Sequence, residues 1–395
     1  MDGTVNSDSS VYYQSGYWND LPAVQRYLNR RATGDPEQSW SAHLGAHRGG
    51  KFAKALVLNC GNGWVERGLL QAGLVGEAVG VDYSDDLVVA ARAEAEAEGL
   101  PIRYAQLDTN SARWPEDGFD LVVNHAAGHH IAYLDRVLRS LAVALPADGV
   151  LVSWDYVGAH RNQYPAAQWE AAAELNASLP ERFRQPAMTY PHLPTMLNTD
   201  PTEAIHAELI RPVMRRYFDV EYVRALGGGL AYPVLTFNTG IFERLDDPET
   251  ADVVKRILVA DGEWTDADPE ARTLFAYVVA RPRKAALDDA AALAAWTAEE
   301  DGREAAAARD GNRYYPDTLL GGLYDELDRL RREVERFHGA LYDARQELEA
   351  RPPVSVGPAA AAAALRGDPR LRAVAKRVPG ARATVRWARR RRRAG

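Results

Sequence analysis

The sequence predicts an α/β fold in which a mostly parallel sheet carries helices on both faces. Three observations support this. Short apolar runs alternate with segments of helical spacing between residues 55 and 155, which is typical of parallel strands joined by crossover helices. A glycine-rich turn follows the first apolar run. The apolar runs are bounded by turn residues, as buried strands are.

Seven apolar segments are predicted to be strands, and four segments between them have helical spacing. Ser84 is a good N-cap for the second of these helices. Residues 156–217 are rich in Pro, Gln, Arg and aromatic residues, and we expect them to cover the carboxyl edge of the sheet. The predicted strands are 55–58, 78–81, 102–107, 119–124, 149–154, 218–223 and 274–280, and the predicted helices are 65–72, 85–98, 131–145 and 233–260.

Outside the predicted α/β domain, the sequence predicts four further segments. Residues 1–54 are expected to form an N-terminal helical segment or lid before the domain of residues 55–283, and residues 284–318 a linker. Residues 319–350 are expected to form a coiled coil, and residues 351–395 an Ala/Pro linker with a basic tail.

The coiled coil rests on an unbroken heptad pattern of about four repeats, which predicts a homo-oligomer. An amphipathic helix packed on its own domain is the alternative. The apolar positions are Leu320, Leu323, Leu327, Leu330, Val334, Phe337, Leu341, Ala344 and Leu348.

The basic tail contrasts with an acidic chain. Residues 366–395 hold twelve Lys or Arg and one acid, about +11, whereas the whole chain carries −8, so the remainder carries about −19. Such asymmetry favours a separate partner for the tail. We favour an anionic membrane surface over nucleic acid as the partner, since the domain is acidic and has no recognisable nucleic-acid-binding module. The alternative is a solvated tail without a partner.

Composition indicates a cytoplasmic protein that contacts the inner membrane face peripherally. The sequence contains no apolar run long enough to span a bilayer and no secretory signal pattern at its start. The single cysteine, Cys60, fits a reducing compartment.

Polar residues at three strand ends point to a nucleoside ligand. Gly61 and Gly63 leave bare backbone after the first strand, and Asp82 ends the second, where a carboxylate can accept both hydroxyls of a ribose. Asp108 follows the third strand. Dinucleotide enzymes keep a third spaced glycine, but Glu66 stands at that position, so an NAD-dependent reductase is disfavoured.

These motifs resemble class I S-adenosylmethionine-dependent methyltransferases, which have a Rossmann-like, seven-stranded fold. Residues 56–63, 80–84, 106–110 and 119–125 are similar to the family's successive motifs over roughly residues 12–283. Four flanking segments resemble a bacterial subgroup associated with surface-polysaccharide synthesis: residues 16–20, 30–34, 155–158 and 161–163. The resemblance implies S-adenosylmethionine as cofactor, bound by Asn59, Gly61, Gly63, Asp82, Tyr83, Asp108, Thr109 and Asn124.

The first motif departs from the family pattern at two positions. Val57 stands where an acidic residue is common, and Asn59 where a glycine is common. Asn tolerates left-handed backbone, so the turn can still form. Glu66 is a candidate replacement carboxylate, or else a solvated helix residue.

Three residues after the fourth and fifth strands are candidates for catalysis: His129, His130 and Asp155. His129 or His130 can act as the base for a hydroxyl acceptor. The alternative is that these histidines serve only in packing or positioning. We expect no metal, because no Cys or carboxylate joins the histidines at a known spacing. His160, Arg161 and Gln163 are further candidates for contacting a polar substrate.

An aromatic cluster precedes the domain and is expected either to clamp over the cofactor or to fasten the segment to the core. It comprises Tyr12, Tyr13, Tyr17 and Trp18. The predicted function is methyl transfer to a small polar acceptor, a sugar by resemblance to the glycan-associated subgroup. The alternative is a non-catalytic scaffold that dimerises through the coiled coil and docks on a membrane.

Overall fold

The computed structural model describes residues 16–185, 188–309, 334, 336 and 337. The chain divides into one unit spanning Met1–Pro316 and a second spanning Asp317–Gly395. In the second unit, the three described residues are helical. The rest of the predicted coiled coil, the Ala/Pro linker and the basic tail lie outside the described residues, so these remain predictions.

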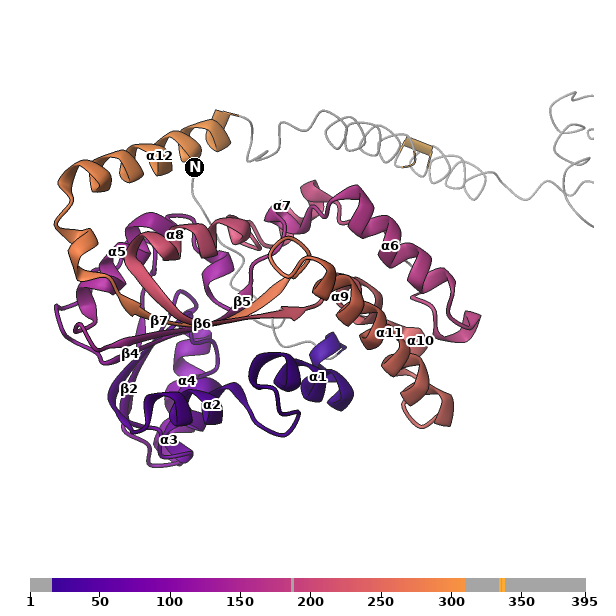
Figure 1. Ribbon diagram of the computed structural model, residues 1–395, viewed down its shortest axis with the longest axis horizontal. Coiled ribbons are helices and arrows are strands. Elements are labelled where there is room, and N and C mark those ends of the chain that lie inside the picture. The colour runs from indigo at the N-terminus through magenta and orange to yellow at the C-terminus, as the bar shows by residue number, and fades with distance from the viewer. Residues whose placement is uncertain (1–15, 186–187, 310–333, 335, 338–395) are drawn as a thin grey trace, which may run out of the picture. The chain divides into compact units, whose positions relative to one another are not determined.

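The first unit is built on a seven-stranded sheet with the order β3-β2-β1-β4-β5-β7-β6 (Figure 1). The first five strands pair in parallel, whereas β7 pairs antiparallel with both β5 and β6. All seven predicted strands are confirmed, with ends shifted by a few residues. They are β1 Phe52–Leu58, β2 Val75–Asp82, β3 Ile102–Gln106, β4 Leu121–His125, β5 Val150–Tyr156, β6 Phe218–Gly227 and β7 Phe275–Pro282.

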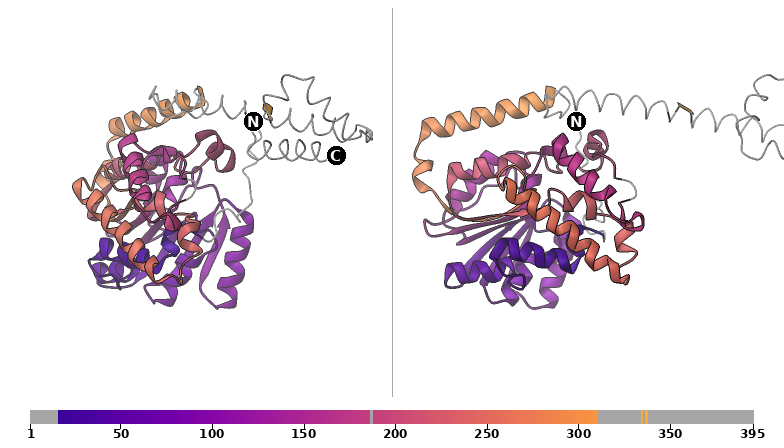
Figure 2. Two further views of the ribbon diagram at one scale, coloured as in Figure 1. Left: turned by 90° about the vertical axis from the view of Figure 1, so that its right-hand side faces the viewer. Right: turned by 45° about the vertical axis from the view of Figure 1, so that its right-hand side comes forward.

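Helices cover both faces of this sheet (Figure 2). The first face packs against α1 Pro22–Thr33, α2 Trp40–Arg48, α3 Trp64–Gln71, α4 Asp85–Ala97, α9 Ala231–Leu235, α10 Thr239–Phe242 and α11 Pro248–Ala267, with part of α6 Ala166–Ala177. The second face packs against α5 Leu134–Ala144, α8 Ile210–Tyr217 and α12 Ala290–Arg309. The remaining helix, α7 Leu193–Thr199, lies in the irregular segment after β5.

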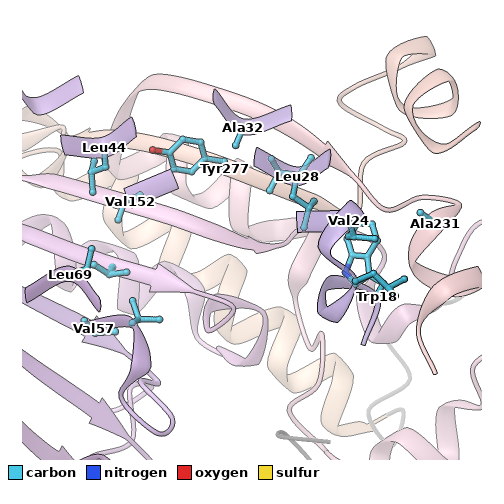
Figure 3. Close-up of a cluster of buried hydrophobic side chains, with 14 of the residues drawn as sticks. Trp18, Val24, Leu28, Ala32, Leu44, Val57, Leu69, Val152, Ala231 and Tyr277 are labelled. Atoms are coloured by element: carbon cyan, nitrogen blue, oxygen red, sulfur yellow. The ribbon is translucent and has the colours of Figure 1, made fainter. Parts of the chain in front are cut away.

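Side chains along β1 point alternately into the two hydrophobic clusters, one on each face of the sheet. Ala55 and Val57 belong to the cluster on the first face, shown in part in Figure 3, while Leu56 and Leu58 belong to the cluster on the second. All four are buried. A strand buried on both faces reads as a continuous apolar run, which is why residues 55–58 were readily predicted. Burying each such side chain stabilises the fold by roughly 1.5–3 kcal/mol.

The predicted helix over residues 233–260 is wrong as a single element, because the structure has three helices there. Capping residues divide the segment. The Asn238 side chain accepts from the backbone N–H of Ile241 at the start of α10, and Asp247 accepts from that of Glu249 at the start of α11, with Pro248 in the first turn. These side chains satisfy the free N–H groups of new helix ends.

The described part of the expected linker, residues 284–309, belongs to the folded unit. After a short 3-10 helix, η7 Lys284–Leu287, the chain enters α12. Glu300 of α12 is 2% exposed and accepts hydrogen bonds from the backbone N–H groups of Asp135 and Arg136 at the start of α5. Trp296 packs edge-on against Tyr217. The folded domain therefore extends to at least residue 309.

The expected helical lid over residues 1–54 is helical in its described part. It contains the 3-10 helix η2 Trp18–Asp20, α1 and α2. Tyr222 of β6 donates a hydrogen bond to the carbonyl of Ala32 at 2.7 Å, so α1 is fastened to the sheet. Among the described helices, none combines the length and apolar character needed to cross a membrane.

Candidate active site

The glycine-rich turn joins β1 to α3 with three residues in the left-handed region. Asn59, Gly61 and Gly63 have φ of 43°, 57° and 77°. A Cβ on Gly63 would lie 2.3 Å from the Tyr104 hydroxyl, so both the backbone angle and the packing require glycine there. Asn59 takes the place of a glycine because Asn tolerates this conformation.

The Asn59 side chain also ties together the loops after three strands. Its amide donates to the carbonyl of Ala127 at 3.1 Å, beyond β4, and its oxygen accepts from the Thr109 hydroxyl at 2.7 Å, beyond β3. The turn is therefore held to both neighbouring loops. Asn59 and Thr109 both line the cleft described below.

Asp82, the last residue of β2, holds the turn from the other side. One carboxylate oxygen accepts from the N–H of Gly61 and the other from that of Ser84, each at 2.9 Å. Each oxygen keeps a further lone pair that can accept from a ligand. Tyr83, half-exposed, follows it at the cleft.

A cleft of about 1880 Å³ opens where the carboxyl ends of the parallel strands meet. Its described lining includes six of the eight predicted cofactor residues: Asn59, Gly61, Asp82, Tyr83, Asp108 and Thr109. It also includes all three predicted catalytic residues, His129, His130 and Asp155. Ligands bind at this edge in open α/β sheets, and the volume exceeds that of an ordinary single-ligand pocket.

Two predicted cofactor residues lie behind the cleft lining. Gly63 is buried under the turn against Tyr104. Asn124 is 6% exposed, and its amide donates to the Ser153 hydroxyl at 2.9 Å and to Asp155 at 2.8 Å. Through these contacts Gly63 and Asn124 support the wall of the cleft, and direct contact of either residue with the cofactor stays a prediction.

Glu66 is neither a ligand in the cleft nor a solvated helix residue. It is fully buried in α3, beside Gly80, where an added Cβ would lie 2.7 Å from its carboxylate. Burial raises its pKa to about 7, although the Tyr104 hydroxyl beside it opposes the shift. The acid missing at Val57 is therefore not replaced at the cleft surface by Glu66.

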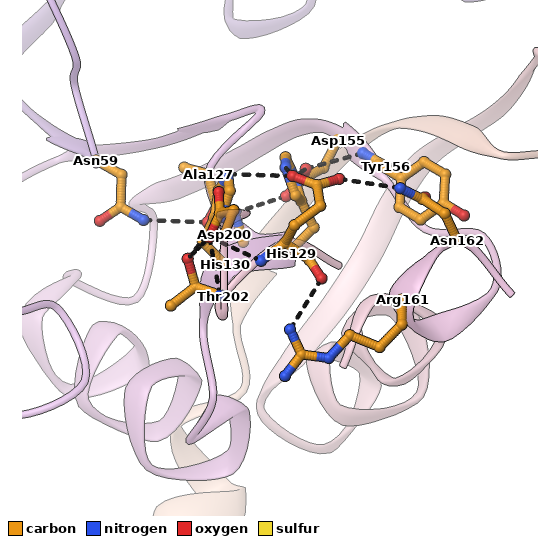
Figure 4. Close-up of polar contacts among 12 residues, drawn as sticks. Asn59, Ala127, His129, His130, Asp155, Tyr156, Arg161, Asn162, Asp200 and Thr202 are labelled. Carbon is orange, nitrogen blue, oxygen red and sulfur yellow. Dashed lines mark hydrogen bonds and ion pairs between the residues drawn. The ribbon is translucent and has the colours of Figure 1, made fainter. Parts of the chain in front are cut away.

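A buried histidine–carboxylate pair lies in the part of the cleft lined by His129, His130 and Asp155 (Figure 4). This part is called the acceptor end below. Nδ1 of His129 lies 2.6 Å from Oδ1 of Asp155. Asp155 also accepts from the backbone N–H groups of Gly128 at 2.7 Å and Tyr156 at 2.8 Å. With the Asn124 amide, Asp155 thus has four donors and a fixed orientation.

His130 stands beside His129, with ring centroids 4.2 Å apart. Its Nδ1 lies 3.1 Å from the Thr202 hydroxyl, which in turn donates to Asp200 at 2.7 Å. Glu203 lies 3.7 Å from Nε2 of His129 and 3.8 Å from Nε2 of His130. Sequence reasoning missed Asp200, Thr202 and Glu203, which follow the histidines by about seventy residues without a recognisable spacing.

The two histidines have opposite pKa shifts. Burial lowers the pKa of His129, but Asp155, Glu203 and Asp200 outweigh it and raise the pKa to about 9. Burial and the neighbouring His129 lower the pKa of His130. At neutral pH His130 is therefore the neutral imidazole of the pair, able to accept a proton.

The third histidine of this region, His125, belongs to an aromatic cluster. Its ring is parallel to that of Trp154, with centroids 6.4 Å apart, and meets the Trp64 ring edge-on at 5.0 Å. Burial lowers its pKa to about 4. It is therefore a neutral ring at physiological pH.

Aromatic side chains form another wall of the cleft. Trp18 is 3% exposed and stacks on Phe275 at 5.4 Å, so it fastens η2 to the core. Tyr17 lines the cleft beside Phe237 at 4.8 Å. Of the two roles expected for this cluster, Trp18 fills the packing role and Tyr17 is placed for the ligand; Tyr12 and Tyr13 lie outside the described residues.

Of the further substrate candidates, Arg161 and Gln163 are buried. The Arg161 guanidinium donates to the backbone carbonyl of Glu203 at 3.2 Å, and the Gln163 amide to the Arg161 carbonyl at 2.9 Å. His160 contacts Glu208. Arg161 therefore supports the segment that carries Glu203, and direct contact of these three residues with a substrate stays a prediction.

The chain is similar in sequence to known methyltransferases. A family model described as a methyltransferase domain matches residues 56–153. The protein-lysine N-methyltransferase EFM4 of Saccharomyces cerevisiae is 29% identical over 140 residues, which are 31% of this chain and 61% of that protein. The uncharacterized methyltransferase YcgJ of Bacillus subtilis is 30% identical over 105 residues, 26% of this chain and 42% of that protein. The chain thus covers less than two thirds of each of these relatives.

Solved structures were matched as well. The crystal structure of YcgJ covers 61% of this chain and 97% of its own, with 18% identity and a TM-score of 0.35. Phosphoethanolamine N-methyltransferase 2 of Haemonchus contortus, in complex with S-adenosyl-L-methionine, covers 71% of this chain and 60% of its own, with 14% identity and a TM-score of 0.41.

The strand order and the family match together define the class of protein. The chain contains a class I S-adenosylmethionine-dependent methyltransferase domain. The residues at the cleft fit that cofactor, because they offer a carboxylate at the end of β2 for a ribose, bare backbone at Gly61 and polar groups after β3.

Proposed function

We propose that this protein transfers a methyl group from S-adenosylmethionine to a hydroxyl of a small polar acceptor, with sugars as the leading class. The observation that carries the proposal is a single cleft lined both by the nucleoside-binding residues and by the His129–Asp155 pair with His130. S-Adenosylmethionine supplies an electrophilic methyl group on a sulfonium sulfur.

The protein side chains supply binding, orientation and proton acceptance. Asp82 offers its carboxylate to the ribose hydroxyls, and Asp108 and Thr109 offer polar atoms beyond β3. At the other end, the neutral His130 can take the proton of an acceptor hydroxyl, a role for which a pKa near or below the working pH is suited. Asp155 holds the adjacent His129 ring in place.

The lining of the cleft supports a sugar-like acceptor. Asp200 and Glu203 are carboxylates that can accept hydrogen bonds from several hydroxyls. Tyr156, Tyr232 and Phe275 also line the cleft, and aromatic rings can stack on the apolar side of sugar rings.

An amine is the second candidate acceptor. Three carboxylates, Asp155, Asp200 and Glu203, line the acceptor end, and a protonated amine would be attracted to them. The matched relatives include a protein-lysine N-methyltransferase. An amine can arrive at the site deprotonated and needs no strong base, so its methylation depends less on His130.

The experiment is an acceptor screen with the full chain. Release of S-adenosylhomocysteine is followed with free sugars, sugar nucleotides and primary amines, and products are identified by mass spectrometry. We expect turnover with a hydroxyl acceptor and at least a 100-fold loss in His130→Ala, with His47→Ala, a surface variant on α2, unchanged. Turnover with amines alone would select the second candidate, and hydroxyl turnover unaffected by His130→Ala would contradict the assigned base.

The sequence of the C-terminal unit supports a further part of the proposal, that the enzyme is a homo-oligomer bound peripherally to an anionic membrane. The support is the heptad pattern and the cluster of arginines in residues 366–395. Sedimentation with anionic vesicles should fall sharply when residues 366–395 are deleted. Equal sedimentation of both proteins would end this part of the proposal.

A further inference from the structure

We infer that His129, His130 and Glu203 form a binding site for a divalent transition-metal cation at the acceptor end of the cleft. One ligand atom from each of the three residues lies within 4.8 Å of the other two. The Oε2 atom of Glu203 is 3.7 Å from Nε2 of His129 and 3.8 Å from Nε2 of His130. Ligands at about 2.0–2.1 Å from a tetrahedral zinc ion are about 3.3 Å apart. The two distances to Glu203 are within about half an ångström of that separation, and the ligand atoms of the two histidines lie no more than 4.8 Å apart.

The hydrogen bonds of the two imidazoles direct Nε2 of each ring toward Glu203. Nδ1 of His129 donates to the Asp155 carboxylate at 2.6 Å, which directs Nε2 toward Glu203. The Thr202 hydroxyl donates to Asp200, so its oxygen accepts from Nδ1 of His130 and leaves Nε2 of that ring as the lone-pair nitrogen. Metal-binding histidines almost always donate their other N–H in this way.

Glu203 is held in a comparable manner. The Asn162 amide donates to Oε1 at 3.3 Å, while Oε2 is the oxygen facing both imidazoles. Its backbone carbonyl accepts from the buried Arg161 guanidinium at 3.2 Å. The Asn162 amide therefore orients the Glu203 carboxylate, and its Oε2 atom faces both histidines.

The charge of the surroundings also favours a cation. Asp155 and Asp200 back the two histidines, with side chains 0% and 12% exposed, and Glu203 adds a third carboxylate. A cation bound at the imidazoles would replace the Nε2 proton of His129 as the positive charge that faces these carboxylates. Two imidazoles and one carboxylate suit zinc, iron and their first-row neighbours in the 2+ state, and they leave open coordination positions.

The three ligands line the cleft, so the open positions can take an oxygen of the acceptor. This inference rests on the proposed function and deepens it, since a bound cation would take the place of the His130 imidazole as the group that activates the acceptor hydroxyl. Cation binding itself depends only on the described residues and can be measured without cofactor or acceptor.

The test is a titration of the full, metal-stripped chain with Zn²⁺ by calorimetry and with Co²⁺ by visible absorption. We expect one equivalent to bind at micromolar concentration or below, with cobalt bands of four- or five-coordinate geometry. Glu203→Gln and His130→Ala should each weaken binding at least 100-fold, and Thr202→Val about 10-fold, because it only orients His130. His47→Ala serves as the surface-histidine control and should bind like the wild type.

Circular dichroism and thermal melting of each variant establish that it is folded before its affinity is compared. Absence of stoichiometric binding by the folded wild type, or binding that Glu203→Gln and His130→Ala leave unchanged, would overturn the inference. S-Adenosylmethionine binding, measured on the same stripped protein, separates this outcome from a failure of the proposed function.

Discussion

The Nδ1 atom of His129 lies 2.6 Å from Oδ1 of Asp155, and Asp155 is buried among four hydrogen-bond donors. Asp155→Ala would leave those donors unsatisfied. We expect the free energy of unfolding to fall by about 3–5 kcal/mol, the range for breaking a buried charged network. Urea denaturation measures it. The surface variant Glu94→Ala should change stability by less than about 0.5 kcal/mol, and an equal small effect for Asp155→Ala would show that the pair is not a structural network.

Glu66→Gln should stabilise the protein at alkaline pH. Burial raises the pKa of Glu66 from 4.5 to about 7, so ionised Glu66 disfavours the folded state. The penalty is absent below pH 4.5, grows as pH rises, and is complete above about pH 7, where it amounts to roughly 3 kcal/mol. The melting temperature of Glu66→Gln relative to wild type should therefore be higher at pH 8 than at pH 5. A difference that is constant with pH would contradict the raised pKa.

Gly63→Ala should disrupt the turn that supports the cofactor end. The residue has φ of 77°, and a Cβ would meet the Tyr104 hydroxyl at 2.3 Å. We expect a loss of about 2–4 kcal/mol from backbone strain and overpacking. Gly68→Ala, in the exposed part of α3 with open space around its Cα, is the matched control and should stabilise by up to about 1 kcal/mol. Equal effects of the two variants, measured by denaturant unfolding, would refute the role of Gly63.

Glu300→Ala should destabilise the domain by about 1–2 kcal/mol, as loss of a helix cap does. Its carboxylate accepts from the N–H of Asp135 at 2.7 Å and of Arg136 at 3.3 Å. Asp301→Ala, on the exposed side of α12, should have little effect. Ending the chain after residue 283 should cost more stability than ending it after residue 309, and equal thermal melts for those two proteins would restore the linker assignment.

The sequence predicted the sheet well because buried parallel strands are continuous apolar runs, as in residues 55–58, and because Ser84 and the turn glycines mark helix starts. The position of Asp82 and Asp108 at the cleft could be predicted for a similar reason, since Asp82 ends β2 and Asp108 comes shortly after β3. Residues 290–309 resembled a linker because they are rich in alanine, and Leu293, Trp296 and Glu300 alone give little periodicity.

The acceptor end could be predicted only in part. His129 and His130 follow β4 and Asp155 lies near the end of β5, so their position at the cleft could be predicted. Asp200, Thr202 and Glu203 come from an irregular segment that only tertiary structure brings to the histidines. Asn124 and Gly63 also stand at strand ends, but the Asn124 side chain and the Gly63 Cα face inward, behind the cleft lining. Burial of that kind depends on the packing of Ser153, Asp155 and Tyr104, which the local sequence does not encode.

The most direct measurement is calorimetric titration of the full chain with S-adenosylmethionine and S-adenosylhomocysteine, with Asp82→Ala and the surface control Glu94→Ala. Asp82 lines the cleft and holds the N–H of Gly61 at 2.9 Å. Loss of its contacts should weaken binding at least 30-fold, since two charge-assisted hydrogen bonds contribute about 2–4 kcal/mol. We predict micromolar binding by the wild type and Glu94→Ala, and greatly weakened binding by folded Asp82→Ala. Failure of the wild type to bind either compound would contradict the methyltransferase function and favour a non-catalytic scaffold.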